Sequence, residues 1–321
     1  MLDPAGRVGV IGLGLIGGSL LRRLTGIGVA AAGWDTDPGT RAAAAGAGLT
    51  VLADVAEVVA TSDTVFLAVP LPAVEPVFRD LAAAASPSGP VFSDLTSVKE
   101  PVRRLALRHG LSFVGGHPMA GAAESGFGAS DAELLAGCAW VLALDEETDL
   151  TAWLGVAATV TGLGCRVVPC TSAVHDTAVA RISHLPHLFA ALLVAGAAQD
   201  PLALSLAAGS FRDATRVATT RPELTAAMCA GNAAAIAEEL RRVAQQMASV
   251  GGLLGDPAGL TEWFAAARAV RQDWPPTATD TWLPAGADLR PRLLALGGAG
   301  GAVTRVAEDG VAACRPATSG D

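Results

Sequence analysis

Two short loops hold side chains that could move a proton and bind a small molecule. They read DLTSVK over residues 94–99 and GGHPMAG over residues 115–121. Histidine can accept a proton near neutral pH, so His117 is a candidate catalytic base, and the glycines beside it would let a ligand come close. The hydroxyl of Ser97 could complete the hydrogen bonding of a substrate alcohol. The structural alternatives are a buried, loop-holding imidazole for His117 and a helix N-cap before residues 98–108 for Ser97.

A second group of charged side chains lies in FRDATR, residues 211–216. Arg212 and Arg216 are four residues apart and therefore share one face of a helix, and Asp213 lies three residues before Arg216. On these residues alone, a solvated face of ion pairs is the better interpretation.

Three histidines fall in one expected helix, residues 175–198. His184 and His187 lie one turn apart, so a metal site that includes Asp176 is conceivable. No motif supplies further ligands at a known spacing, and we predict no metal. His175 and Asp176 are better explained as a hydrogen-bonded pair near a helix start.

The segment that must position this chemistry is residues 7–35. Its apolar run over 8–11 predicts a buried parallel strand, and the glycines that follow have the G-x-G-x-x-G spacing of dinucleotide-binding turns. A helix from about Ile16 to Leu24 would point its positive N-terminus at a pyrophosphate. We predict that the cofactor contacts in this turn are Gly12, Gly14, Leu15, Ile16 and Gly17.

An acidic residue supports the same site. Asp35 ends a second apolar run and lies 23 residues after Gly12, where a carboxylate binds ribose hydroxyls and repels a 2′-phosphate. NAD is therefore the predicted cofactor. Val69 and Pro70 end the strand expected over 64–69, at the sheet edge where cofactors bind, and are added to the predicted site. The alternative is a glycine-rich turn that binds no nucleotide, and Asp35 argues against it.

The remaining pattern predicts an α/β fold, a Rossmann-type doubly wound, mostly parallel sheet followed by an all-α domain. Apolar runs and helical stretches alternate through the first half, with later strands expected at 90–94, 112–114, 140–144 and 166–168 in that sheet. We predict helices over 175–198, 202–219, 222–250 and 259–274. The predicted domains are 1–170, 171–275 and an irregular tail, 276–321, with at most a small hairpin.

Composition excludes several classes of protein. The net charge of −9 and pI near 5.0 make nucleic acid an unlikely partner, because phosphate binding needs a basic face. The N-terminus shows no secretory signal, and the uninterrupted apolar run at 188–198 is too short to span a bilayer, so we expect no membrane partner. Five cysteines without close pairing fit reduced thiols. These features predict a cytoplasmic protein.

Several motifs, taken in order, resemble the prephenate dehydrogenase family. They are GLGLIGGS, DLTSVK, GGHPMAG, HD, SHLPH and FRDATR, and they span residues 7–250. The resemblance implies a Rossmann domain, an all-helical domain that forms a homodimer, and an active site between the two domains. It also implies an NAD-dependent oxidative decarboxylation of a small cyclohexadienyl substrate, whose ring becomes aromatic.

The resemblance gives the candidate residues roles. His117 is then the base for the C4 hydroxyl, and Ser97 supports the same oxygen. Arg216 matches the arginine that binds a substrate carboxylate, a task suited to its planar fork, and Arg212 and Asp213 lie beside it. His187 matches a histidine of the substrate pocket. We expect Arg216 and His117 to face each other across one six-membered ring.

One departure from the family pattern affects substrate choice. Ala122 and Ala123 follow HPMAG where the family usually has a polar residue and a pocket-gating Glu, and Glu124 comes one residue later. The substrate is therefore prephenate or a relative such as arogenate or 4-amino-4-deoxyprephenate. A tail this short predicts weak or no feedback inhibition.

Two other functions share part of this sequence pattern. A protein that binds NAD without catalysis could act as a sensor. A reductase of the β-hydroxyacid type would need a lysine base in the helical domain, whereas the single lysine, Lys99, lies in the nucleotide half.

Overall fold

The computed structural model describes residues 6–86, 89–122 and 124–317, and it divides into two compact units. The first unit runs to His175 and also includes Thr279–Arg315, and the second comprises Asp176–Ala278. The sequence analysis expected the first domain to end at residue 170, whereas the first segment of this unit ends at His175. Each unit is described separately below.

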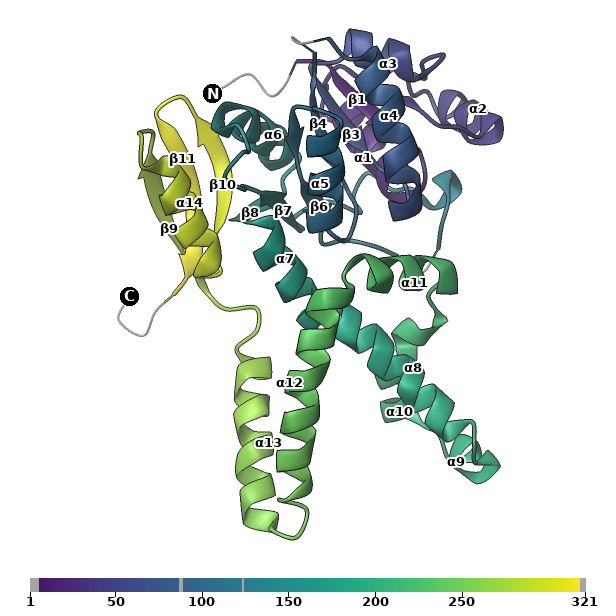
Figure 1. Ribbon diagram of the computed structural model, residues 1–321, viewed down its shortest axis with the longest axis vertical. Helices are drawn as coiled ribbons and strands as arrows, with labels where there is room; N and C mark the ends of the chain where they lie inside the picture. Colours follow the sequence, from purple (N-terminus) through teal and green to yellow (C-terminus); the bar gives the residue numbers. More distant parts are fainter. Residues whose placement is uncertain (1–5, 87–88, 123, 318–321) are drawn as a thin grey trace. The chain divides into compact units, whose positions relative to one another are not determined.

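The nucleotide half of the first unit is a five-stranded parallel sheet. Its strand order, β2-β1-β3-β4-β5, changes direction at β1, as in doubly wound folds. The strands β1, β3 and β4 are labelled in Figure 1. The strands form where the apolar runs lie, and β1 and β3 are completely buried because helices cover both faces of the sheet. The strands are β1 (Val8–Ile11), β2 (Ala31–Trp34), β3 (Thr64–Leu67), β4 (Val91–Asp94) and β5 (Phe113–Val114).

Two hydrophobic cores correspond to the two faces of this sheet. Leu20 of one helix and Trp153 of another belong to the first core, and Phe78 and Val102 belong to the second. The first face is covered by α1 (Leu15–Gly26) and α6 (Leu150–Gly162), and the second by α3 (Val55–Thr61), α4 (Val74–Ala84) and α5 (Glu100–Arg108). The short helix α2 (Pro38–Gly46) follows β2.

The later strands form a second sheet, which corrects the prediction of a single one. The chain leaves the first sheet after β5 and enters β6 (Gly116–Pro118), which pairs antiparallel with β7 (Ala139–Ala143). β7 in turn pairs in parallel with β8 (Arg166–Cys170). The strands expected at 140–144 and 166–168 therefore exist but belong to this sheet. Consequently His117 lies on a strand rather than in a loop.

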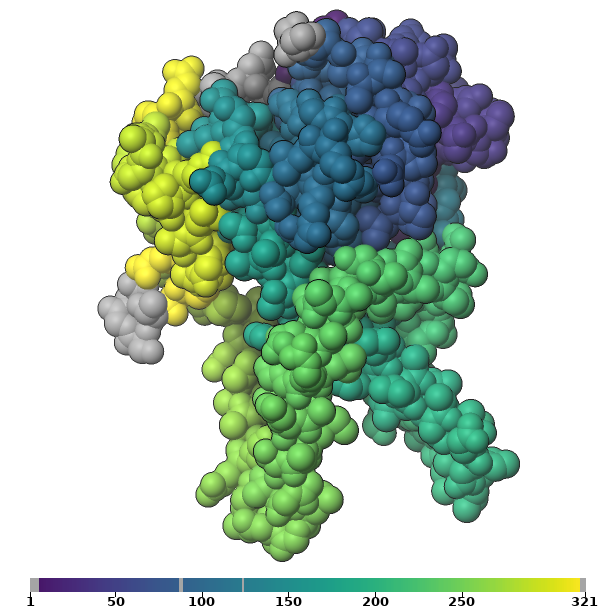
Figure 2. All heavy atoms as spheres, viewed as in Figure 1, coloured from purple at the N-terminus to yellow at the C-terminus, as the bar shows by residue number. Residues whose placement is uncertain are grey.

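The C-terminal segment is ordered secondary structure, which corrects the prediction of an irregular tail. It forms β9 (Ala278–Pro284), α14 (Leu289–Gly298) and the hairpin β10 (Ala302–Ala307) and β11 (Gly310–Pro316), which complete the second sheet in the order β6-β7-β8-β10-β11-β9. Val303 pairs with Val167 and belongs to the same core as Trp153. In Figure 2 the yellow C-terminal residues lie against the teal residues of this unit.

The second unit is all-helical, as predicted, but its helices are shorter than the sequence pattern indicated. The expected helix over 222–250 is interrupted at Asn232, and the one over 202–219 is divided into three pieces. The elements are η3 (Ala180–His184, a π-helical turn), α8 (Leu185–Ala197), α9 (Pro201–Ser205), α10 (Gly209–Thr215), η4 (Arg216–Thr219), α11 (Pro222–Gly231), α12 (Ala233–Gly251) and α13 (Pro257–Gln272). The connecting helix α7 (Ser172–Val179) begins in the first unit.

One helical run is more apolar than the sequence count suggested. The helical run Ser172–Ala197 is long and apolar enough to cross a membrane by length and composition alone. Within it, 28% of the apolar 18-residue window is buried inside the structure. The same run carries Asp176 and Arg181, and its exposed Ile182 and Leu192 belong to a larger set of exposed apolar side chains in the second unit. A surface of this kind suits contact with another protein chain.

Candidate active site

The glycine turn has the geometry that a dinucleotide requires. Gly12 has φ +90°, which disfavours any residue with a Cβ, and a Cβ on Gly17 would come 1.9 Å from the Gly12 carbonyl oxygen. A Cβ on Gly14 would meet no atom within 4 Å. Gly14 is also the N-cap of α1, so no side chain caps the first N–H groups of this helix. The turn is thus closely packed at Gly12 and Gly17 and open at Gly14, where the helix N-terminus can bind a phosphate group.

The other predicted cofactor residues surround this turn. Asp35 follows β2, and its carboxylate accepts hydrogen bonds from the backbone N–H groups of Leu13 at 2.6 Å and Asp37 at 2.9 Å. Val69 lies next to Gly12: its Cγ1 atom is 3.1 Å from the position that a Cβ on Gly12 would occupy. Pro70 is exposed and precedes the 3₁₀ turn η1 (Leu71–Ala73), while Leu15 and Ile16 are half-buried in the first turn of α1. This arrangement fits NAD, with Asp35 at the position suited to ribose.

A buried ion pair holds the DLTSVK loop against the strand that carries His117. The carboxylate of Asp94 pairs with the Lys99 ammonium, and both side chains have no exposed area. Lys99 also donates to the Gly116 carbonyl oxygen at 2.6 Å, and Asp94 Oδ1 accepts from the Gly116 N–H at 3.0 Å. Gly116, the residue before His117, is therefore held at both its N–H and its C=O.

Ser97 lies inside this loop. It is half-buried, in a bend that lies between Thr96 and Lys99. The N–H of Thr96 donates to the Asp94 carboxylate at 3.0 Å. The N-cap of α5 is Lys99, so the interpretation of Ser97 as the helix cap is wrong. The prediction that Ser97 contacts a substrate oxygen stays a prediction.

His117 has a partner that the sequence did not indicate. Its Nδ1 lies 2.9 Å from Nε2 of His175, with the two ring planes at 77°. His175 is only 2% exposed, in the first turn of α7. We expected His175 to pair with Asp176 near a helix start. Its contact with His117 joins residues 58 positions apart, and no local pattern indicates it.

The second unit brings His187 and Arg216 together. Burial lowers the pKa of His187 below 6.5, a hydrogen bond to the Val217 backbone opposes this shift, and the positive charge of Arg216 lowers the pKa further. η4 packs on α8, which explains the proximity. The guanidinium of Arg216 is exposed, so it can receive an anion.

Arg212 and Asp213 are mostly solvated. Their side chains are 83% and 82% exposed and lie 4.0 Å apart. α10 ends at Thr215 and Arg216 begins a 3₁₀ turn, so the expectation of one continuous helical face through Arg212 and Arg216 is wrong.

His184 is completely buried beside Asn232. The Asn232 amide nitrogen donates to the Asp176 carbonyl oxygen at 2.7 Å and lies 3.1 Å from Nδ1 of His184. His184 Nδ1 must therefore be the acceptor, which assigns its proton to Nε2. Among the described residues, no group of three His, Cys, Asp or Glu side chains is arranged to hold a metal ion.

Comparison with known proteins identifies the family. The model of the prephenate dehydrogenase nucleotide-binding domain matches residues 18–169, and that of its dimerization domain matches residues 171–264. A cyclohexadienyl dehydrogenase from Zymomonas mobilis is 32% identical over 242 residues, which cover 71% of this chain and 82% of that protein. The chain belongs to the prephenate dehydrogenase family. The family and fold predicted from the sequence are thereby confirmed.

Two solved structures extend the comparison. A candidate prephenate dehydrogenase from Corynebacterium glutamicum is 32% identical with a TM-score of 0.82, covering 93% of this chain and 98% of that one. The arogenate dehydrogenase of Synechocystis is 30% identical with a TM-score of 0.72, covering 83% and 97%. The chain spans 45% and 60% of the length of two further curated relatives, both prephenate dehydrogenases. Relatives in this family thus differ in the substrate for which they are named.

We expect Gly14→Ala to weaken nucleotide binding in this prephenate dehydrogenase family member without destabilising it. The added Cβ meets no protein atom within 4 Å but occupies the space through which a pyrophosphate approaches. Isothermal titration with NAD⁺ should show an affinity loss of about 10-fold or more, equivalent to roughly 1.4 kcal/mol.

The matched control for Gly14→Ala is Gly26→Ala, at the other end of α1, where a Cβ also meets nothing within 4 Å. That variant should bind NAD⁺ normally. Equal affinity of the Gly14 and Gly26 variants would contradict the placement of the pyrophosphate.

The depressed pKa of His187 predicts a pH effect on stability. Because the folded state takes up the proton at lower pH than the unfolded state, stability is unaffected well above pH 6.5 and falls as pH drops through 6.5. His187→Asn should remove this part of the acid destabilisation, as measured by urea unfolding at pH 7.5 and 5.5. The same loss of stability on acidification in both proteins would show that His187 does not titrate as described.

Proposed function

We propose that this chain is an NAD⁺-dependent dehydrogenase that oxidatively decarboxylates prephenate or a close cyclohexadienyl analogue. The observation that carries the proposal is the placement of His117 on β6, directly after a peptide held by the Asp94–Lys99 pair, in the unit that also has the glycine turn. A base needs such fixed placement to meet a substrate hydroxyl at hydrogen-bond distance.

The residues divide the reaction between them. The His117 imidazole accepts the proton of the C4 hydroxyl, and Ser97 supports the same oxygen. Bound NAD⁺ supplies the hydride acceptor. As the hydride leaves C4, the bond to the ring carboxylate breaks, CO₂ departs and its electron pair completes the aromatic ring. The proton held by His117 is then available to the new phenol oxygen.

The second unit supplies the charge that orients the substrate. Arg216 binds a carboxylate, and the depressed pKa of His187 keeps that imidazole neutral, so it can donate or accept a hydrogen bond near neutral pH. Arg212 and Asp213 lie one turn earlier in the chain, and their charges would contribute to the electrostatic field around Arg216.

We propose a cytoplasmic homodimer assembled through the helical domain, with no membrane or nucleic-acid partner. Support comes from the match of residues 171–264 to the dimerization domain and from exposed apolar side chains on the second unit. Leu202, Leu206 and Met247 are 63%, 71% and 65% exposed, an unusual amount of apolar surface for a chain acting alone.

Substrate choice depends on the segment after Gly121. Ala122 and Glu124 are exposed, and Ala123 lies outside the described residues. An alanine at position 123 removes the acidic side chain that the family places near the pocket. We propose prephenate as the substrate, with arogenate and 4-amino-4-deoxyprephenate as alternatives.

The deciding experiment is an NADH absorbance assay of the purified protein with prephenate, arogenate and 4-amino-4-deoxyprephenate in parallel, each with NAD⁺ and NADP⁺. We expect the highest kcat/KM with prephenate and NAD⁺, because the carboxylate of Asp35 repels a 2′-phosphate. NAD⁺ binding without reduction by any of the three compounds would favour the sensor function instead.

Arg216→Ala is expected to raise KM for the substrate. Loss of a charge-assisted contact to a carboxylate costs roughly 2 to 5 kcal/mol if the site is desolvated, which is at least about 30-fold in KM. Steady-state kinetics of Arg216→Ala and Arg212→Ala, compared side by side, measure this. A larger KM effect in the Arg212 variant would move the carboxylate site to Arg212.

A further inference from the structure

The contact between His117 and His175 constrains where the protons lie. At 2.9 Å, the two ring nitrogens are at hydrogen-bond distance, so one carries a proton and the other offers a lone pair. If His175 donated, His117 would be neutral only with its proton on Nε2, and it would then have no lone pair left for a substrate. If His117 donates from Nδ1, its Nε2 keeps a lone pair. Only the second arrangement makes His117 a base.

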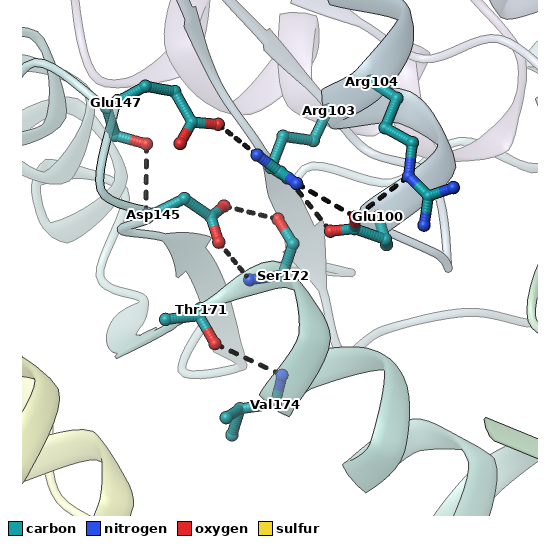
Figure 3. A network of polar contacts seen from close by, with 9 residues as sticks. Glu100, Arg103, Arg104, Asp145, Glu147, Thr171, Ser172 and Val174 are labelled. Atoms are coloured by element: carbon teal, nitrogen blue, oxygen red, sulfur yellow. Dashed lines mark hydrogen bonds and ion pairs between the residues drawn. The ribbon is translucent and has the colours of Figure 1, made fainter.

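His175 is held firmly enough to impose this choice. It is 2% exposed, and its backbone N–H donates to the Thr171 carbonyl oxygen at 2.9 Å. The start of α7 is fixed by Ser172, whose N–H and hydroxyl donate to the Asp145 carboxylate at 2.9 and 2.6 Å (Figure 3). Asp145 and Ser172 are themselves buried. The imidazole of His175 therefore has a defined position before any substrate binds.

His117 is held from the other side. It lies in β6, where it pairs with Val141 of β7, and the preceding Gly116 peptide is bound by Asp94 and Lys99. Two separately anchored backbones thus bring the rings together, one from the second sheet and one from α7. Such an arrangement orients a catalytic group because neither ring can turn without losing the hydrogen bond.

We propose that His175 is a positioning residue for His117, accepting the Nδ1–H of His117 and so presenting its Nε2 lone pair to the substrate hydroxyl. The inference rests on the proposed function. In the reaction the substrate O–H bond breaks and an Nε2–H bond forms on His117, while His175 stays neutral with its own proton on Nδ1. The same hydrogen bond stabilises the resulting imidazolium. A buried acceptor stabilises the catalytic histidine of hydrolytic triads in the same way.

Kinetics of two variants test this role. His175→Leu removes the acceptor, and His175→Gln places an amide oxygen near the position of Nε2. We expect kcat of the Leu variant to fall at least about 10-fold, since a wrong tautomer removes the base. Substrate KM and NAD⁺ affinity should stay near the parent values, and the Gln variant should recover most of the lost kcat. Equal kcat in the Leu and Gln variants, or a Leu variant with parental kcat, overturns the proposal.

The tautomer can also be read directly, without substrate. ¹⁵N-edited NMR of histidine-labelled protein should show His117, assigned with His117→Asn, protonated at Nδ1 in the parent at neutral pH. In the Leu variant the signal should move toward the Nε2–H form. A parent protein with His117 in the Nε2–H form overturns the proposal, even if the Leu variant fails to fold. Loss of turnover with every cyclohexadienyl substrate would instead refute the proposed function and leave the NMR result valid.

Discussion

Replacing His117 by alanine should lower kcat by about 10²- to 10⁴-fold, the usual contribution of a positioned general base. NAD⁺ affinity should remain nearly intact, because His117 lies on β6 of the second sheet while the glycine turn and Asp35 follow strands of the first. Stopped-flow and steady-state NADH formation, together with calorimetric NAD⁺ binding, separate the two effects.

A suitable control for His117→Ala is His109→Ala. His109 is the C-cap of α5, and its ring packs edge-on against Phe78 at 6.5 Å, in the first unit but away from the glycine turn. That variant should keep parental turnover. Normal turnover in His117→Ala would remove His117 from the mechanism, and an equal loss of NAD⁺ affinity would show that the histidine acts on the cofactor site.

The second large effect is expected at Lys99. Replacing it by methionine leaves the Asp94 carboxylate buried without its cation, and breaking a buried pair in this way costs roughly 3 to 5 kcal/mol of unfolding free energy. The Gly116 carbonyl oxygen also loses a donor, so the strand that carries His117 should loosen. Urea unfolding measures the first effect, and kcat of the folded fraction measures the second.

Arg104→Met provides the comparison for Lys99→Met. Arg104 is 65% exposed and pairs with Glu100 at 2.9 Å, so its loss should cost less than about 1 kcal/mol. The double variant Lys99→Met with Asp94→Leu should be less destabilised than Lys99→Met alone, because no buried charge remains. Equal stability of the Lys99 and Arg104 variants would mean that the buried pair carries no structural role.

Local sequence signals were sufficient for the nucleotide half. The glycine spacing, the apolar runs and the acid at position 35 each depend on residues close in the chain. In the structure Gly12 and Gly17 pack closely in one turn, and the Asp35 carboxylate accepts a hydrogen bond from the Leu13 N–H. Steric demands on a tight turn allow few residue types, so a short motif can specify the geometry. The family motifs that contain His117 and Arg216 were recognised in the same local way.

Pairings between distant segments were decided only by the tertiary structure. Val303 pairs with Val167, and His175 meets His117, across separations that no periodic pattern records. Residues 276–321 looked irregular because they are rich in small residues, glycine and proline, and their strands are recognisable only from the sheet that they join at β8. Cys138 and Cys165, unpaired in the sequence, have sulfur atoms 3.8 Å apart for the same reason.

The chain itself therefore determined which residues could do the chemistry, through local motifs whose residue types admit few alternatives. The tertiary structure decided how those residues are held. Asp94 and Lys99 hold Gly116 from within the core, and His175 is the partner of His117. These contacts form because a polar group buried away from water costs free energy unless it is hydrogen-bonded.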